Sequence, residues 1–121
     1  MPGPAVNETT RVTKEDGSAV CERCVVADSA LPRMRGLLGR SELPAGEGIL
    51  LRPAPSVHMF FMRFPIDVVF LDRDLRVVDV RHGLRPWRVA SKRGAKSALE
   101  LAEGEARRRG VEVGDRLVLA A

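Results

Sequence analysis

The sequence predicts a mostly-β protein, namely a compact antiparallel β barrel or sandwich with two short helices. Eleven glycines and eight prolines are spread along the 121 residues, which favours many short strands over long helices. Four of the five aromatic residues lie between Phe60 and Phe70, so we expect the densest part of the core there. A chain of this length closes one core, which predicts a single β-rich domain over residues 9–121 after a disordered leader at 1–8.

The first expected elements are a hairpin, a helix and a short strand. Strands at Thr9–Lys14 and Val20–Val26 flank the Asp16-Gly17 step, which favours a tight hairpin turn. Apolar residues at helical spacing then predict a short helix that ends at Gly39. A short apolar strand is expected at Ile49–Leu51.

The middle of the chain is expected to form an antiparallel meander. Its strands are Ser56–Arg63, Ile66–Leu71 and Leu75–Val80, with the first two joined through Phe64-Pro65. The remaining predicted elements are, in order, strands at Trp87–Ala90 and Ala98–Leu101, a short helix within Glu103–Arg109, and strands at Val111–Val113 and Arg116–Ala120.

The positive charge of the chain is concentrated in one stretch. The formal net charge is +4, from 20 Lys+Arg against 16 Asp+Glu. Residues 81–96 hold six of the cations and no acid, whereas the rest of the chain has more acids than cations. Cations around Trp87 are typical of surfaces that bind an acidic protein, another anion or nucleic acid. A protein or nucleic-acid interaction module acting through residues 81–96 is therefore one functional alternative, in which nucleic acid is the less favoured partner.

Targeting signals and familiar catalytic motifs are missing from the sequence. No apolar run approaches the ~20 residues of a membrane-spanning helix, and the N-terminus lacks the basic start and apolar core of a signal peptide. We therefore expect a cytoplasmic protein that is a monomer or weak dimer. The sequence has no Gly-x-Ser-x-Gly, Walker, His-Glu-x-x-His or dinucleotide motif, so we assign no cofactor and no catalytic residue.

The two cysteines are expected to be unconnected thiols. Cys21 and Cys24 lie three positions apart in a predicted strand, which places their side chains on opposite faces. Three strand residues also separate their Cα atoms by roughly 10 Å, beyond the ~7 Å limit for a disulfide. The expectation is therefore no bond between them and no shared metal ion.

The apolar segment 56–67 carries the main binding hypothesis. If Ser56–Arg63 is a strand, then His58, Phe60 and Met62 share one largely apolar face. We expect this face to line a pocket that binds a small, anionic ligand without converting it, with Arg35 and Arg88 as candidate anion contacts. The candidate ligand-binding residues are Arg35, His58, Phe60, Met62, Asp67, Trp87 and Arg88.

Catalysis is the alternative for the same segment. His58 would then be a general acid or base, oriented by the Asp67 carboxylate. If strands pair across Phe64-Pro65, however, His58 lies several residue pairs away from Asp67. Asp67 is then better explained as a buried carboxylate that anchors backbone N–H groups or pairs with an arginine. His58 and Met62 alone are too few ligands for copper(I), so no metal site is assigned here.

Several motifs occur in the order found in one known family. They are Arg35-Gly36-Leu37-Leu38-Gly39-Arg40, Ser56-Val57-His58, Phe61-Met62-Arg63-Phe64-Pro65-Ile66-Asp67, Arg85-Pro86-Trp87-Arg88, Leu99-Glu100-Leu101-Ala102-Glu103-Gly104 and Gly110-Val111-Glu112-Val113-Gly114-Asp115. On these motifs the chain resembles the bacterial and archaeal proteins catalogued as domain of unknown function 192. The resemblance implies a compact mostly-β fold with short helices, and it implies no activity. The motif residues to examine first are Arg35, His58, Met62, Asp67, Trp87 and Asp115.

Overall fold

The computed structural model describes residues 9–27, 42–59 and 62–120. The predicted leader at 1–8 and the predicted helix that ends at Gly39 lie outside these ranges, as do Arg35 and Phe60. The mostly-β prediction is confirmed. Within the described ranges, no helix has the length and apolar character needed to cross a bilayer.

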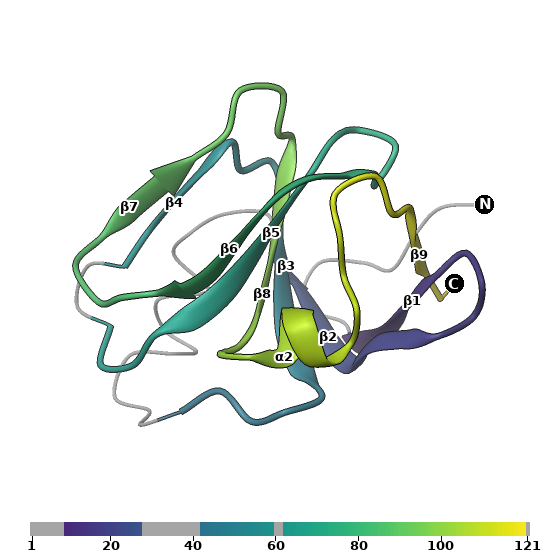
Figure 1. Ribbon diagram of the computed structural model, residues 1–121, viewed down its shortest axis with the longest axis horizontal. Coiled ribbons are helices and arrows are strands. Elements are labelled where there is room, and N and C mark those ends of the chain that lie inside the picture. Colours follow the sequence, from purple (N-terminus) through teal and green to yellow (C-terminus); the bar gives the residue numbers. More distant parts are fainter. Residues whose placement is uncertain (1–8, 28–41, 60–61, 121) are drawn as a thin grey trace.

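Seven strands form one sheet, and two more form a separate ribbon (Figure 1). The elements are β1 (Thr9–Lys14), β2 (Ala19–Ala27), β3 (Glu47–Leu51), β4 (Ser56–His58), β5 (Ile66–Leu71), β6 (Val77–Leu84), β7 (Val89–Ser91), β8 (Ser97–Ala102), α2 (Glu105–Arg108) and β9 (Leu117–Leu119). The sheet order is β6-β5-β8-β3-β2-β1-β9, and β4 pairs with β7 in the ribbon.

The sheet is mixed, because β2 and β3 run parallel. Parallel neighbours need a crossover of a dozen or more residues, and the connection 28–46 is long enough to supply one. The prediction of a purely antiparallel sheet is therefore wrong at this pair. All other pairs of described strands are antiparallel.

The first hairpin forms as the sequence predicts. The turn between β1 and β2 places Gly17 at φ +90°, a left-handed conformation that glycine adopts without strain. The Asp16 carboxylate accepts a hydrogen bond from the Ser18 backbone N–H at 2.8 Å, which closes the turn locally.

Two irregularities in β2 change the direction of its side chains. Thr10 pairs with Cys24, Val12 with Cys21 and Thr13 with Ala19, so the register shifts twice along the hairpin. A β-bulge interrupts the alternation of faces, and Cys21 and Cys24 consequently join the same buried cluster. The prediction that strand alternation separates the two cysteines is therefore wrong.

The predicted strand Ser56–Arg63 is much shorter in the structure. β4 ends at His58, and the Met62 backbone N–H donates to the Met59 carbonyl oxygen at 3.2 Å. β4 also pairs with β7 rather than with β5, so the predicted meander is wrong at its first strand. β5 instead lies between β6 and β8 and is buried on both faces.

The segment after α2 also differs from the prediction. Residues 111–113 form no strand. The Glu112 N–H donates to the Asp115 carboxylate at 2.8 Å, and the Asp115 N–H donates to the Glu112 carbonyl at 3.1 Å. These local bonds hold a turn that leads into β9.

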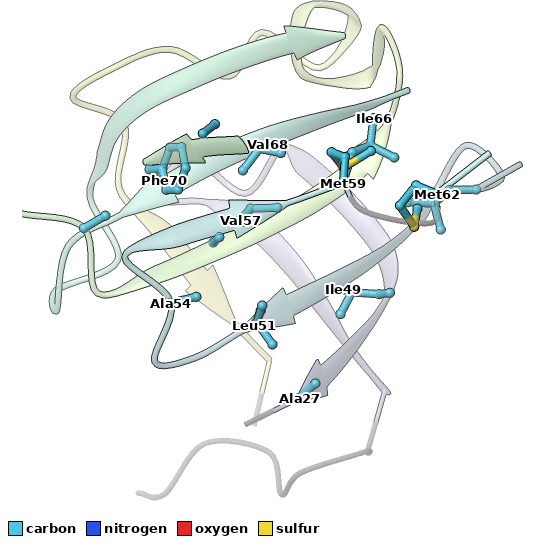
Figure 2. Packing of buried hydrophobic residues seen from close by; sticks show 14 of the residues in the cluster. Ala27, Ile49, Leu51, Ala54, Val57, Met59, Met62, Ile66, Val68 and Phe70 are labelled. Atoms are coloured by element: carbon cyan, nitrogen blue, oxygen red, sulfur yellow. The ribbon is translucent and has the colours of Figure 1, made fainter. Parts of the chain in front are cut away.

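The buried side chains form two clusters, one on each face of the sheet. The ribbon cluster lies between the sheet and the β4–β7 ribbon (Figure 2) and contains Ala27, Leu43, Ile49, Leu51, Ala54, Val57, Met59, Met62, Phe64, Ile66, Val68, Phe70, Ala90, Ala95 and Ala98. The inner cluster contains Val12, Val20, Cys21, Cys24, Leu50, Val69, Leu71, Val77, Leu99, Leu101, Ala106, Val111 and Leu117. Both edge strands contribute to the inner cluster, so the sheet curls around it.

The two edges of the curled sheet meet at one end. Arg76, just before β6, and Arg116, just before β9, form an isolated antiparallel bridge. The Val77 N–H donates to the Asp115 carbonyl at 2.7 Å beside it. The bridge joins the edge strands without extending the sheet along their whole length.

Candidate functional site

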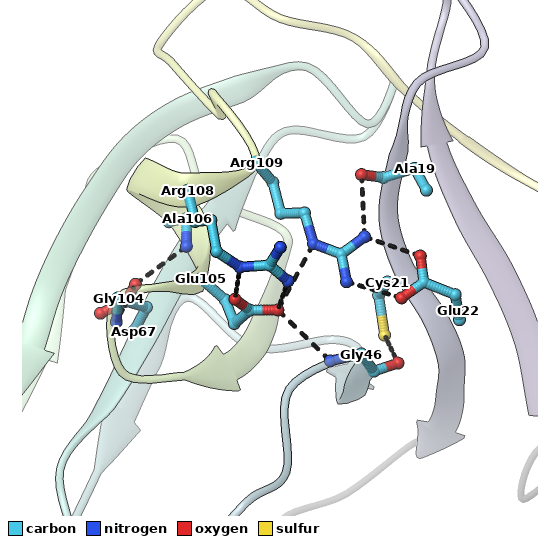
Figure 3. A network of polar contacts seen from close by, with 10 residues as sticks. All are labelled: Ala19, Cys21, Glu22, Gly46, Asp67, Gly104, Glu105, Ala106, Arg108 and Arg109. Carbon is cyan, nitrogen blue, oxygen red and sulfur yellow. Dashed lines mark hydrogen bonds and ion pairs between the residues drawn. The ribbon is translucent and has the colours of Figure 1, made fainter.

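Asp67 is a fully buried carboxylate that holds three backbone segments together. Its Oδ1 atom accepts the Gly83 N–H at 2.9 Å. Its Oδ2 atom accepts the N–H groups of Gly104 and Ala106, both at 3.0 Å (Figure 3). These bonds tie β5 to the end of β6 and to the start of α2. The interpretation of Asp67 as a backbone anchor is confirmed.

His58 and Asp67 lie on opposite sides of the sheet. Ile66 and Val68, the neighbours of Asp67 in β5, point into the ribbon cluster, so Asp67 points to the other face. His58 belongs to β4, which packs against the ribbon cluster through Val57. The structure therefore does not bring together the acid–base pair that the sequence left as an alternative.

The predicted pocket residues His58 and Met62 differ in their burial. Met62 is buried in the ribbon cluster together with Met59, whereas His58 is only half-buried. The Met62 N–H donates to the Met59 carbonyl, a contact that residues three apart in one extended strand do not make, so His58 and Met62 do not share a strand face.

Trp87 has an unusual backbone conformation at the entrance to β7. Its φ is +69°, in the left-handed region that bulky residues rarely adopt. The Arg88 N–H donates to the Arg85 carbonyl at 3.2 Å, which places Trp87 at the third position of a turn where glycine is usual when φ is positive. The Trp87 N–H donates to the Met59 carbonyl, and the Met59 N–H donates to the Arg88 carbonyl, both at 2.8 Å. These bonds fix the conformation.

The fixed turn presents an exposed basic and apolar surface. Trp87 and Val89 are each 59% exposed. We call the exposed residues around them the ribbon surface: Arg85, Trp87, Arg88, Val89, Lys92 and Arg93. Within the described ranges, no ion pair involves its four cations. Figure 1 shows this end of the molecule well apart from β1 and β9.

Arg81, the first cation of the predicted basic stretch, has a different position. Its Nε atom pairs with Asp79 Oδ2 at 2.6 Å, and its Nη2 atom donates to the Ser91 carbonyl at 3.0 Å. The side chain thereby links β6 to β7. It supports the ribbon rather than adding a free charge to the ribbon surface.

An ion-pair network joins α2 to the start of β3 (Figure 3). Glu105 accepts bonds from Arg108 at 2.5 and 2.8 Å and from the Gly46 N–H at 3.3 Å. Arg109 binds Glu22 through two bonds of 2.6 Å. The Arg108 guanidinium lowers the pKa of the Glu105 carboxyl. The sequence predicts a short helix within Glu103–Arg109, but nothing in the spacing indicates that Arg109 contacts Glu22 or that Glu105 contacts Gly46.

Glu100 is a buried carboxylate that sequence reasoning missed. It is fully buried in β8, where it pairs with Ile49 of β3 and Val68 of β5. Ala98, two residues earlier, points into the ribbon cluster, so Glu100 points to the same face. An acidic residue within the apolar strand 97–102 was the signal that could have identified it.

A family model and curated relatives of this chain indicate one family. The model for domain of unknown function 192, described as an uncharacterised ACR, matches residues 11–119. A UPF0127 protein of Thermococcus sibiricus is 35% identical over 88% of this chain and 71% of its own length. A UPF0127 protein of Pyrococcus abyssi is also 35% identical, over 95% of this chain and 96% of its own length. A crystal structure from Sinorhizobium meliloti, described as a candidate transcription regulator, has a TM-score of 0.79 at 24% identity. It covers 97% of this chain and 98% of that one, and it supports the fold alone.

Proposed function

The chain belongs to the family of domain of unknown function 192, and we propose that it is a non-catalytic binding module whose ribbon surface docks an acidic segment of a partner protein. The small-ligand pocket of His58, Phe60 and Met62 stays a prediction, and Phe60 lies outside the described residues. The ribbon surface is the better-supported site, because its side chains are exposed and their backbone is fixed.

The observation that carries this proposal is the conformation of Trp87. A bulky residue at positive φ costs on the order of 1–3 kcal/mol, and such strain is concentrated at functional sites. Here three backbone hydrogen bonds hold the turn, and the indole remains largely exposed. The fold thus retains a strained backbone at a tryptophan whose side chain is exposed to solvent between Arg85 and Arg88.

The composition of the ribbon surface favours an acidic protein segment as the partner. Tryptophan and arginine are the residues that most often dominate protein–protein binding energy. Val89 adds an exposed apolar side chain, which suits a peptide better than a phosphate backbone. Four cations that form no ion pair with other residues of the described ranges provide the charge complementarity. A small molecule would require a concave site, whereas the side chains of the ribbon surface are exposed.

The experiment follows the fluorescence of Trp87, which is the single tryptophan of the chain. The protein is titrated with a decapeptide of alternating glutamate and leucine, at low and high salt. We expect a saturable change in fluorescence and weaker binding at high salt. The double variant Arg85→Glu/Arg88→Glu should bind at least about tenfold more weakly, because like charges then oppose the peptide.

The matched control is Arg73→Glu/Arg107→Glu, which makes the same change in net charge at two exposed arginines elsewhere. This control should bind the peptide like the wild type. Equal loss in both double variants would reduce the effect to net charge and contradict the proposal. Binding of an oligothymidylate decamer in place of the peptide would assign the ribbon surface to nucleic acid instead.

A further inference from the structure

The outer edge of β7 carries backbone groups that the pairing with β4 does not use. The Lys92 N–H donates to the Pro55 carbonyl at 3.2 Å, and the Met59 N–H donates to the Arg88 carbonyl at 2.8 Å. These two hydrogen-bonded pairs lie at the two ends of the β4–β7 ladder and are in register with it. Bonded and non-bonded pairs alternate along antiparallel strands. Ala90 therefore bonds to β4, whereas the backbone groups of the residue on either side of it point away from β4.

The outward backbone groups belong to Val89 and Ser91. Within the described ranges, no hydrogen bond outside the β4–β7 ladder involves the N–H groups of these two residues or the Val89 carbonyl oxygen. The Ser91 carbonyl oxygen accepts a bond from the Arg81 guanidinium at 3.0 Å, so a donor outside the ribbon already reaches this edge. The edge thus offers two N–H donors and one carbonyl acceptor to a further strand.

The edge of β7 is accessible from solvent. Val89 is 59% exposed and Ser91 is exposed, and only Ala90 between them is buried. Figure 1 shows β7 at the outer border of the molecule, with β4 on its inner side. An antiparallel strand placed against this edge exchanges two hydrogen bonds with Val89 and accepts one from the Ser91 N–H.

We propose that the acidic partner segment binds in an extended conformation, as a third strand along the outer edge of β7. This inference rests on the proposed function, because it describes how the same partner is held at the ribbon surface. In complexes formed by strand addition, main-chain hydrogen bonds supply affinity and alternate side chains of the added strand supply specificity.

The charges around this edge favour an acidic strand over a second copy of β7. Arg88 and Lys92 flank the strand, and residues 81–96 contain no acid. Pairing two copies of β7 would set the cations of one copy against those of the other, and like charges directly opposite destabilise a strand pair. Cations at an edge strand are a known protection against such self-pairing. An added strand with acidic side chains instead gains charge complementarity from the same residues.

The first test modifies the backbone of the glutamate–leucine decapeptide. In an extended peptide the N–H groups of the glutamates lie along one edge and those of the leucines along the other. One peptide is N-methylated at its central glutamates, and the matched peptide carries the same number of methyl groups at its central leucines. In the Trp87 fluorescence titration, one of them should bind like the unmodified peptide and the other at least about tenfold more weakly, because only one edge faces β7.

The outcomes of this titration separate the two proposals. Equal affinities of the two methylated peptides would overturn strand addition, while binding of the unmodified peptide would still support the proposed function. Failure of the unmodified peptide to bind would overturn both.

The second test removes a donor from the protein. Val89→Pro lacks the N–H that points away from β4, and Val89→Ala is the matched control because it also loses the valine side chain but keeps the N–H. Val89→Pro should bind the unmodified peptide at least about tenfold more weakly than Val89→Ala. Circular dichroism establishes that both variants are folded, and if Val89→Pro is not, the methylated peptides decide the question with the wild type. Equal affinity of the two folded variants would contradict the added strand.

Discussion

Replacing Asp67 with asparagine should remove part of the anchor that joins β5, β6 and α2. The carboxylate accepts three backbone N–H groups, at 2.9, 3.0 and 3.0 Å. The carbonyl oxygen of an asparagine can take the Gly104 and Ala106 donors, but its NH₂ group then faces the Gly83 N–H. One buried donor is left without an acceptor, which costs about 1–3 kcal/mol. The two remaining bonds lose their charge assistance, at about 1 kcal/mol each.

The expected loss is about 2–4 kcal/mol in the free energy of unfolding, because a neutral amide is also less costly to bury than a carboxylate. Urea unfolding followed by circular dichroism measures it. Asp74→Asn is the control, since Asp74 is exposed, and it should change stability by less than about 0.5 kcal/mol. Amide hydrogen exchange should accelerate first at Gly83. A stability of Asp67→Asn within about 0.5 kcal/mol of the wild type would refute the anchor argument.

Three further predictions concern other sites. Trp87→Gly should stabilise the fold by about 1 kcal/mol in urea unfolding followed by circular dichroism, because glycine adopts φ +69° without strain, and a loss of stability would contradict the strain. Binding of a fluorescein-labelled form of the acidic peptide, followed by anisotropy because this variant has no tryptophan, should fall. The pKa of Glu105 is lowered in the folded protein, so its ion pair with Arg108 stabilises the protein above pH 4.5 and this stabilisation is lost as the pH falls through the folded-state pKa. Glu105→Gln should therefore flatten the acid side of the curve of unfolding free energy against pH. An unchanged curve would contradict the ion pair. Gly48→Ala should lower the thermal midpoint markedly, since its Cβ would lie 2.9 Å from the Glu100 carbonyl oxygen and 3.0 Å from the Cys21 sulfur; an unchanged midpoint would show that the backbone can adjust.

The sequence was most informative where the signal is local. The first hairpin follows from the turn signal Asp16-Gly17. β5 has the predicted bounds because its residues are apolar except for Asp67. The role of Asp67 could also be predicted, since a carboxylate within such a run needs donors and backbone N–H groups are the nearest supply.

Long-range pairing was less predictable. β4 ends early, at His58, and the Met62 N–H bonds to the Met59 carbonyl within a segment whose composition equally suits a strand. The register shifts in β2 reverse the relation of its cysteines, and no residue type between them demands a bulge. The conformation of Trp87 is set by Met59, far away in sequence, so inspection of residues 85–88 could not reveal it.

The pairing of β1 with both an early and a late strand sets the order in which its two edges can be covered during synthesis. β1 pairs with β2 on one side and with β9 on the other, where Val12 lies opposite Leu119. The hairpin can form as soon as it leaves the ribosome, but the outer edge of β1 stays open until β9 has been made, several seconds later at roughly 5–20 residues per second. An open strand edge is a template for pairing with another chain. The nascent protein is therefore vulnerable to misassembly through the open edge of β1 until β9 has been made.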